Sequence, residues 1–198
     1  MGRIRPVTAA LRLGVLASGR GSNLRNLLDR GYRVVAVATN RPSCGAAAIA
    51  RERGVPLGEL SQRGFPSLEA RDAAMRDWLL GHGVEVVVNA GYDRILHPIF
   101  LAGFPGRVIN VHPSLLPAFG GGMDAVERAL AHGVRISGCT VHVVTDEVDA
   151  GPILLQAAVP VRPGDTVETL RARIQAEEHR ILPEAIEAIA QASPSLRQ

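Results

Sequence analysis

The sequence predicts an α/β fold: a mostly parallel, Rossmann-like sheet flanked by helices, with an antiparallel C-terminal strand pair and a long C-terminal helix. Short apolar, β-branched runs alternate with helical stretches in the first half, which is typical of a parallel sheet covered by helices. Two longer β-type runs in the second half are joined by a loop too short for a helical crossover. Helical periodicity then extends from residue 166 to residue 190.

The first half of the chain supplies the expected parallel sheet. We expect strands at residues 13–17, 34–38, 55–60, 84–89 and 107–111, because each is a short apolar run. Between them the pattern predicts helices at residues 23–29, 46–53 and 67–80. Gly54 ends the second helix, with Pro56 two residues further on. The third helix is expected to place its apolar side chains on one side, namely Leu68, Ala73, Ala74, Trp78 and Leu79.

The second half changes character after a flexible, Gly-rich stretch at residues 118–122. A helix is expected at 123–131, followed by strands at 135–143 and 153–159. These strands are predicted to be antiparallel, because the loop between them is short. The final helix has a possible kink at Pro183, and the tail from Ser193 is expected to be frayed.

The length of 198 residues is enough for one domain with a sizeable core, which we place at residues 11–192; the alternative is two small lobes. Residues 1–10 contain Arg3 and Arg5 but lack the apolar region of a signal peptide, so we expect a short disordered extension there. No apolar run is long enough to span a bilayer. We therefore expect a cytoplasmic protein with no membrane partner.

All 22 basic residues are arginine, which excludes a Schiff-base lysine, a P-loop lysine and a Tyr-Lys catalytic pair. The net charge of +3 is spread along the chain, without an Arg-rich run that contains aromatics, so no nucleic-acid partner is expected. Cys44 and Cys139 are far apart and match no metal-ligand spacing. We expect both to be buried, reduced thiols and expect no metal site.

Two polar residues, Asn110 and His112, stand at the end of a predicted strand that Pro113 terminates. Residues two apart in a strand point to the same side, so both side chains are expected to face one cleft. A carboxamide and an imidazole in that position can hold a carbonyl oxygen and move a proton beside it. The alternative is a strand end with two solvated polar residues, and spacing alone does not decide between these interpretations.

The segment Gly19-Arg20-Gly21-Ser22-Asn23 lies between a predicted strand and a predicted helix. Glycines allow close backbone approach to an anion, and the helix N-terminus offers unpaired N–H groups. The pattern favours a phosphate site. It is not the dinucleotide fingerprint, because the third glycine is absent, nor a Walker loop, because lysine is absent. The alternative is an ordinary tight turn with a Ser or Asn cap.

Further candidate residues stand in the second half. His142 lies in a β-type run and is predicted to be a hydrogen-bonded core or supporting histidine. Of the acids in the following loop, Asp149 is the best candidate to face inward and favour a charged imidazole, because small residues follow it. The alternative is that all three acids of this loop, Asp146, Glu147 and Asp149, belong to a solvated turn. Glu178 stands in the final helix, where a charged stretch usually faces solvent.

Four motifs, taken together, resemble one family. They are Ser18-Gly19-Arg20-Gly21-Ser22-Asn23-Leu24, Asn110-Val111-His112-Pro113-Ser114-Leu115-Leu116-Pro117, Gly138-Cys139-Thr140-Val141-His142 and Asp146-Glu147-Val148-Asp149-Ala150-Gly151-Pro152. The chain is similar, from about residue 11 to residue 189, to the phosphoribosylglycinamide formyltransferases, the folate-dependent glycinamide ribonucleotide transformylases of purine biosynthesis. The second motif is specific for folate formyltransferases, and the first narrows the resemblance to the ribonucleotide branch.

The resemblance implies roles for residues of both halves, a phosphate-binding half at 11–106 and a catalytic and folate half at 107–192. The implied catalytic trio is Asn110, His112 and Asp149, with His142 in support. Residues implied to bind the ribonucleotide are Gly21, Ser22, Asn23 and Glu178. Residues implied to bind the folate are Asp93, Arg94, Ile95, Leu96 and Asn110.

The implied cosubstrate is 10-formyltetrahydrofolate, the implied acceptor is glycinamide ribonucleotide, and the implied assembly is a monomer or homodimer. The chain departs from the family in two places. Leu68 stands where the family often has a folate-contacting arginine, which Arg71 would have to replace. The 118–125 loop also lacks a histidine that is often found there, which affects the contacts of the loop with substrate rather than the chemistry.

The resemblance implies formyl transfer to the ribonucleotide amine through a tetrahedral intermediate, with its oxygen held by Asn110 and His112. A 10-formyltetrahydrofolate hydrolase is the nearest alternative, disfavoured by the phosphate loop and the absence of an N-terminal regulatory domain. A methionyl-tRNA formyltransferase would need a basic C-terminal domain. A catalytically idle nucleotide-binding module and an NAD-dependent reductase are disfavoured by the trio and by the incomplete glycine fingerprint, respectively.

Overall fold

The structure, a computed structural model, describes residues 11–192. These residues form two compact units. The first contains residues 11–108 and 186–192, and the second contains residues 109–185. The expected disordered extension at 1–10 and the expected frayed tail from Ser193 lie outside the described residues.

Four parallel strands form the sheet of the first unit, in the order β3-β2-β1-β4. Their bounds are Leu13–Leu16 for β1, Val34–Thr39 for β2, Leu57–Glu59 for β3 and Val86–Asn89 for β4. Every residue of β1 is buried, as expected for a parallel strand covered on both faces. The N–H of Val87 donates to the carbonyl of Arg107 at 2.8 Å, so the pairing of β4 extends to the residue before β5.

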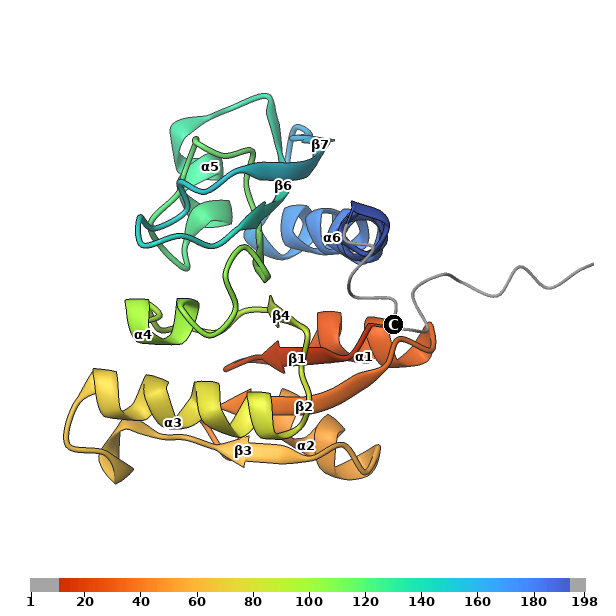
Figure 1. Cartoon of the computed structure of the whole chain (residues 1–198). Helices are drawn as coiled ribbons and strands as arrows, with labels where there is room; N and C mark the ends of the chain where they lie inside the picture. The colour runs from red at the N-terminus through yellow and green to blue at the C-terminus, as the bar shows by residue number, and fades with distance from the viewer. Residues whose placement is uncertain (1–10, 193–198) are drawn as a thin grey trace, which may run out of the picture. The chain divides into compact units, whose positions relative to one another are not determined.

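Helices connect these strands. They are α1 (Ser22–Asp29), α2 (Gly45–Glu52), α3 (Leu68–Gly81) and the four-residue α4 (Pro98–Leu101), with a 3₁₀ turn, η2, at Gln62–Gly64. Right-handed crossovers place α1 and α2 on one face of the sheet and α3 on the other. Figure 1 shows α3, in yellow, running alongside the orange strands β2 and β3. Because these strands are parallel, the polar carboxyl ends of β1, β2 and β4 lie at one edge of the sheet.

The apolar side predicted for helix α3 is wrong. Its buried residues are Arg71, Asp72, Met75 and Leu79, whereas Leu68 is 54% exposed. Nη2 of Arg71 lies 2.6 Å from Oδ1 of Asp72, and both side chains are fully buried. Oδ2 of Asp72 accepts from the N–H of His97 at 2.7 Å. A buried charge is tolerated when it is paired in this way, so a pattern of apolar residues alone misplaces this face.

The strands of the second unit are antiparallel, in the order β5-β6-β7. They span Val108–His112, Ile136–Val143 and Ile153–Pro160. Figure 1 shows β6 and β7 as adjacent blue-green strands. Helix α5 spans Ala125–His132, and α6 spans Val167–Ala192 and continues past Pro183.

The predicted fold class is confirmed, including the parallel strands, the antiparallel pair and the long last helix. The structure adds an antiparallel pairing of β5 with β6 and the short helix α4. Cys139 is buried as expected. Cys44 is only half-buried, because it stands at the N-cap of α2, with its Sγ 3.4 Å from Oγ1 of Thr39.

Candidate functional site

Strand β5 brings Asn110 and His112 to one face of the second unit. The antiparallel register sets Asn110 opposite His142 and His112 opposite Thr140. His112 is 5% exposed, and Asn110 is half-buried. Because residues two apart in a strand share a face, one partner can reach both side chains.

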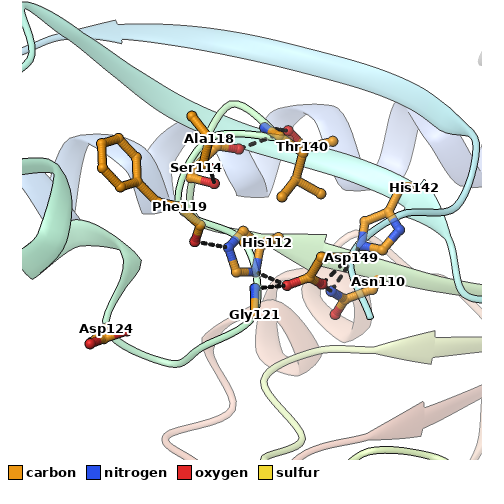
Figure 2. Close-up of polar contacts among 12 residues, drawn as sticks. Asn110, His112, Ser114, Ala118, Phe119, Gly121, Asp124, Thr140, His142 and Asp149 are labelled. Atoms are coloured by element: carbon orange, nitrogen blue, oxygen red, sulfur yellow. Dashed lines mark hydrogen bonds and ion pairs between the residues drawn. The ribbon is translucent and has the colours of Figure 1, made fainter. Parts of the chain in front are cut away.

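That partner is Asp149. Its Oδ1 accepts from Nδ2 of Asn110 at 3.4 Å and lies 3.5 Å from Nε2 of His142. Its Oδ2 lies 3.5 Å from Nδ1 of His112 and accepts from the N–H of Gly121 at 2.8 Å. Figure 2 shows the carboxylate at the centre of these groups. The predicted trio is thus brought together, with His142 and a main-chain donor added to it.

The environment of Asp149 holds it ionised. The pKa of its carboxyl falls to about 2, because the bond with His142, the Gly121 N–H and the charges of His112 and His142 outweigh the opposing effect of burial. Its backbone has a φ of 55°, in the left-handed region that few non-glycine residues adopt. This conformation turns the side chain inward from a loop in which Asp146 and Glu147 are exposed.

His142 is a supporting residue in this geometry. It is 1% exposed, and its Nδ1 lies 3.0 Å from the carbonyl of Val143. A carbonyl only accepts, so Nδ1 carries a proton, and Nε2 of the neutral ring accepts from Nδ2 of Asn110 at 3.1 Å. In the protonated ring, Nε2 faces Asp149 instead. Both arrangements fix the amide of Asn110 with its Nδ2 toward Asp149.

Both nitrogens of His112 face oxygen acceptors. Nδ1 faces Asp149, and Nε2 lies 3.1 Å from the main-chain carbonyl of Phe119. Figure 2 shows this carbonyl directed at the ring. A doubly protonated ring is the form that can donate to both groups. The carbonyl of Phe119 and the N–H of Gly121 are functional groups that sequence reasoning missed, because every residue type carries them.

In the first unit, Gly21 begins helix α1 with a φ of 79°. A Cβ at this position would lie 2.7 Å from the Cα of Ala46, so only glycine fits for two separate reasons. Ser22 and Asn23 follow in the first turn of α1. A helix N-terminus attracts anions in general, and the phosphate role of this segment stays a prediction.

A second polar group in the first unit joins the ends of three strands. Oγ of Ser18 donates to Oδ1 of Asn40 at 2.6 Å and accepts from the N–H of Asp93 at 3.1 Å. Nδ2 of Asn40 donates to Oδ1 of Asp93 at 2.8 Å, which closes a ring of three residues. Arg41 forms an ion pair with Asp93.

Asp93 is held ionised by this ring. Burial would raise the pKa of Asp93, but the bonds from Asn40 and Ser18 and the charges of Arg41 and Arg94 lower it overall. No sequence pattern indicated this ring, because its members are far apart along the chain. The signal that could have found it is the set of polar residues at the carboxyl ends of neighbouring parallel strands.

The remaining predicted folate residues differ in exposure. The guanidinium-bearing side chain of Arg94 is 56% exposed, Ile95 is 71% exposed and Leu96 is 7% exposed. The side chain of Ile95 is thus open to solvent in this structure, and the folate role of residues 93–96 stays a prediction. Arg71, the possible replacement for the family arginine at Leu68, is fully buried with Asp72. In this structure it is a core residue.

Glu178 in α6 is 9% exposed, unlike Glu177, which pairs with Arg180 on the helix surface. The alternative that Glu178 faces solvent is therefore wrong. Among residues 11–192, no group of three or more His, Cys, Asp or Glu side chains is arranged to hold a metal ion. No helix in that part of the chain is long and apolar enough to cross a membrane.

Comparisons with known proteins agree with one another. The formyl transferase family model matches residues 11–186. Phosphoribosylglycinamide formyltransferase of Mycobacterium tuberculosis (strain H37Rv) is 48% identical over 93% of this chain and 87% of its own length. The Escherichia coli (strain K12) enzyme of the same name is 39% identical over 87% of this chain and 84% of its own length.

A solved structure gives the same result for the fold. Glycinamide ribonucleotide transformylase 1 from Symbiobacterium toebii superposes with a TM-score of 0.89 at 49% identity, covering 92% of this chain and 88% of that one. The family model, the sequence relatives and this structural neighbour all extend over most of the chain. The chain therefore belongs to the formyl transferase family.

Proposed function

We propose that this protein is a phosphoribosylglycinamide formyltransferase. It transfers the formyl group of 10-formyltetrahydrofolate to the amine of glycinamide ribonucleotide, giving formylglycinamide ribonucleotide and tetrahydrofolate in de novo purine biosynthesis. The observation that carries the proposal is the ionised Asp149 among Asn110, His112 and His142. The names of the Mycobacterium tuberculosis and Symbiobacterium toebii relatives supply the substrate class.

The proposed chemistry follows from the charges of the trio. Attack of the neutral amine on the formyl carbon makes the nitrogen positive and the formyl oxygen negative. Asn110 donates to that oxygen, and so does Nε2 of His112, whose proton the oxygen shares with the carbonyl of Phe119. Aimed donors of this kind are worth roughly 3–4 kcal/mol each. The carboxylate of Asp149 stabilises the protonated ring of His112 and the developing positive charge on the amine.

Asp149 acts through its charge in this proposal. With a pKa of about 2, its carboxylate is too weak a base to hold the amine proton at neutral pH. The protonated His112 gives its Nε2 proton to the departing folate nitrogen as the bond from that nitrogen to the formyl carbon breaks, and the neutral ring then takes the amine proton; alternatively, a water that His112 holds relays the proton. The amide protons of Asn110 face Asp149 and His142 in this structure, so the formyl oxygen takes the place of one of these partners.

The two substrates are assigned to separate groups of residues. In the first unit, Gly21, Ser22 and Asn23 are assigned to the ribonucleotide phosphate. Residues 93–96 of the same unit are assigned to the folate, which covers the exposed side chain of Ile95. Holding both substrates makes a bimolecular step effectively unimolecular.

A spectroscopic assay that follows the conversion of 10-formyltetrahydrofolate tests the proposal. We expect turnover only when glycinamide ribonucleotide is added. Formyl release at full rate without it would establish a hydrolase instead. In the variant His112→Ala we expect most turnover to be lost with little change in either KM. Wild-type turnover in this variant would remove His112 from the mechanism.

We further propose that the protein acts in the cytoplasm as a monomer or homodimer, with residues 11–192 as one domain. The biosynthetic role of the relatives supports the location. Light scattering on the purified protein measures the assembly directly, and a trimer or larger species would contradict this part of the proposal.

A further inference from the structure

The carbonyl that faces His112 belongs to a strained residue. Phe119 has a φ of 58°, in the left-handed region that bulky residues avoid. Such a conformation persists only where the surrounding structure holds it. Oγ of Ser114 donates to the carbonyl of Ala118 at 2.5 Å, and this bond fixes Ala118, the residue before Phe119.

Arg128, in helix α5, holds the other side of this turn. Its Nη1 donates to the carbonyl of Gly120 at 3.0 Å and makes a longer contact of 3.5 Å with the carbonyl of Phe119. Its guanidinium carbon lies 5.8 Å from the centre of the Phe119 ring, within range of a cation–π contact. Nη1 of Arg128 also lies 3.7 Å from Oδ1 of Asp124.

The turn held by Arg128 supplies main-chain partners to two members of the trio. The carbonyl of Phe119 faces Nε2 of His112, and the N–H of Gly121 donates to Asp149. These groups lie two residues apart, so a shift of the turn moves both at once. A carbonyl on one side and a carboxylate on the other define the plane in which the His112 ring lies.

We propose that Arg128 is a positioning residue for the reaction, acting through the carbonyl of Phe119 on His112. The inference rests on the proposed function for its effect on turnover. Among residues 11–192, Arg128 contacts Phe119, Gly120 and Asp124 rather than Asn110, His112 or Asp149. Its exposed position on α5 makes it replaceable without a cavity in the core.

Steady-state kinetics of Arg128→Ala give the first test. We expect kcat to fall about 10- to 100-fold, the range for small misplacements of a catalytic group, with both KM values within about twofold. Arg128→Lys restores one donor and is expected to recover part of the loss. Arg171→Ala is the matched control, because Arg171 is also a partly exposed arginine bound to α5, through Glu127. It is expected to keep wild-type kcat.

The second test reads the ring of His112 directly by NMR of ¹⁵N-labelled protein. The signal is assigned by its loss in His112→Asn. We expect a solvent-protected Nε2 proton in the wild type and in Arg171→Ala, and its loss in Arg128→Ala. Phe119→Leu keeps the carbonyl but removes the ring, so it is expected to retain the protected proton.

The outcomes separate the two proposals. If the wild type does not formylate glycinamide ribonucleotide but loses the protected proton in Arg128→Ala, the proposed function fails and the positioning role of Arg128 on the ring stands. If Arg128→Ala keeps both kcat and the protected proton, the inference is overturned. An equal loss of kcat in Arg171→Ala also overturns it, because the effect would then come from α5 in general.

Discussion

The polar regions of the first and second units differ in the kinds of groups that form them. In the first unit, Gly21 shapes the turn that we propose to bind phosphate, and Asp93 is enclosed by Ser18, Asn40 and Arg41. In the second unit, Asp149 directly contacts the side chains that we propose to carry the chemistry. One carboxylate therefore closes a ring of structural partners, whereas the other contacts the proposed catalytic side chains.

This difference predicts different kinetic signatures. A region that shapes the backbone acts on ligand affinity, so its variants are expected to change KM. A region that holds charge beside the reacting atoms acts on the transition state, so its variants are expected to change kcat. A change in kcat from variants of the first region, together with a change in KM from variants of the second, would contradict this difference.

The largest effect is expected for Asp149→Asn. The amide is of similar size but removes the charge that favours protonated His112, and it accepts more weakly from Gly121. We expect kcat to fall on the order of 10³-fold, the upper range for loss of one transition-state contact. Steady-state kinetics with both substrates measure this, and KM for the ribonucleotide is expected to stay within about threefold.

A large rise in KM with unchanged kcat would place Asp149 in binding and remove the contrast between the two regions. A suitable comparison variant is Asp146→Asn, because Asp146 is an exposed acid of the same loop. It is expected to behave as the wild type.

A smaller effect, on affinity, is expected for Gly21→Ala. The φ of 79° and the 2.7 Å approach of a Cβ to Ala46 force the turn to move. We expect KM for glycinamide ribonucleotide to rise about 10-fold, which corresponds to about 1.4 kcal/mol, while kcat changes little.

Gly31→Ala is the matched control for this substitution. Gly31 follows the other end of α1 with the same φ of 79°, but nothing lies within 4 Å of its Cβ position. Both variants are expected to lower Tm, and only Gly21→Ala is expected to raise KM. Equal KM values in the two variants would mean that the shape of the Gly21 turn does not contribute to phosphate binding.

Side-chain identity and strand spacing made Asn110, His112 and Asp149 candidates, and the family resemblance implied their grouping as a catalytic trio. Asn110 and His112 were expected on one face from their spacing in β5, and Asp149 was expected to face inward from its small neighbours. The carbonyl of Phe119 and the N–H of Gly121 could not be predicted, because main-chain groups leave no mark on residue type. Their positions depend on left-handed backbone at Phe119 and at Gly121, and a glycine marks this conformation only at the second position.

The same limit explains what was missed in the fold. The order and type of the long elements followed from apolar periodicity, but α4 has only four residues and shows no period. The buried face of α3 contains Arg71 and Asp72, which a hydrophobic pattern assigns to the surface. Their burial depends on each other and on the His97 N–H, a contact across a separation of 25 residues.

Asp93→Ala tests whether the closed ring of the first unit acts on affinity. The substitution removes the acceptor of Asn40 and the partner of Arg41, so residues 93–96 lose an anchor to the ends of β1 and β2. We expect KM for 10-formyltetrahydrofolate to rise about fivefold, or about 1 kcal/mol, with little change in kcat.

Asp77→Ala is the control for loss of an acid in the same unit. Asp77 pairs with Arg76 on the surface of α3, and its side chain is 63% exposed. It is expected to leave both KM values unchanged. If Asp93→Ala lowers kcat as strongly as Asp149→Asn, the ring of the first unit is part of the catalytic apparatus and the proposed division of tasks is wrong.

The last expected effect is on acid stability rather than on the kinetics. The pKa of Asp149 falls from 3.8 to about 2 on folding, so the unfolded chain binds the proton more tightly. The resulting stabilisation is complete above about pH 4 and is lost as pH falls through 2; it amounts to at most roughly 2 kcal/mol. Urea unfolding at pH 7 and at pH 2.5 measures it, and Asp149→Asn is expected to lose less stability between these values than the wild type does. Equal losses would show that the carboxylate is no better stabilised in the folded protein than in the unfolded chain, and the contrast between the two regions would then lack its electrostatic basis.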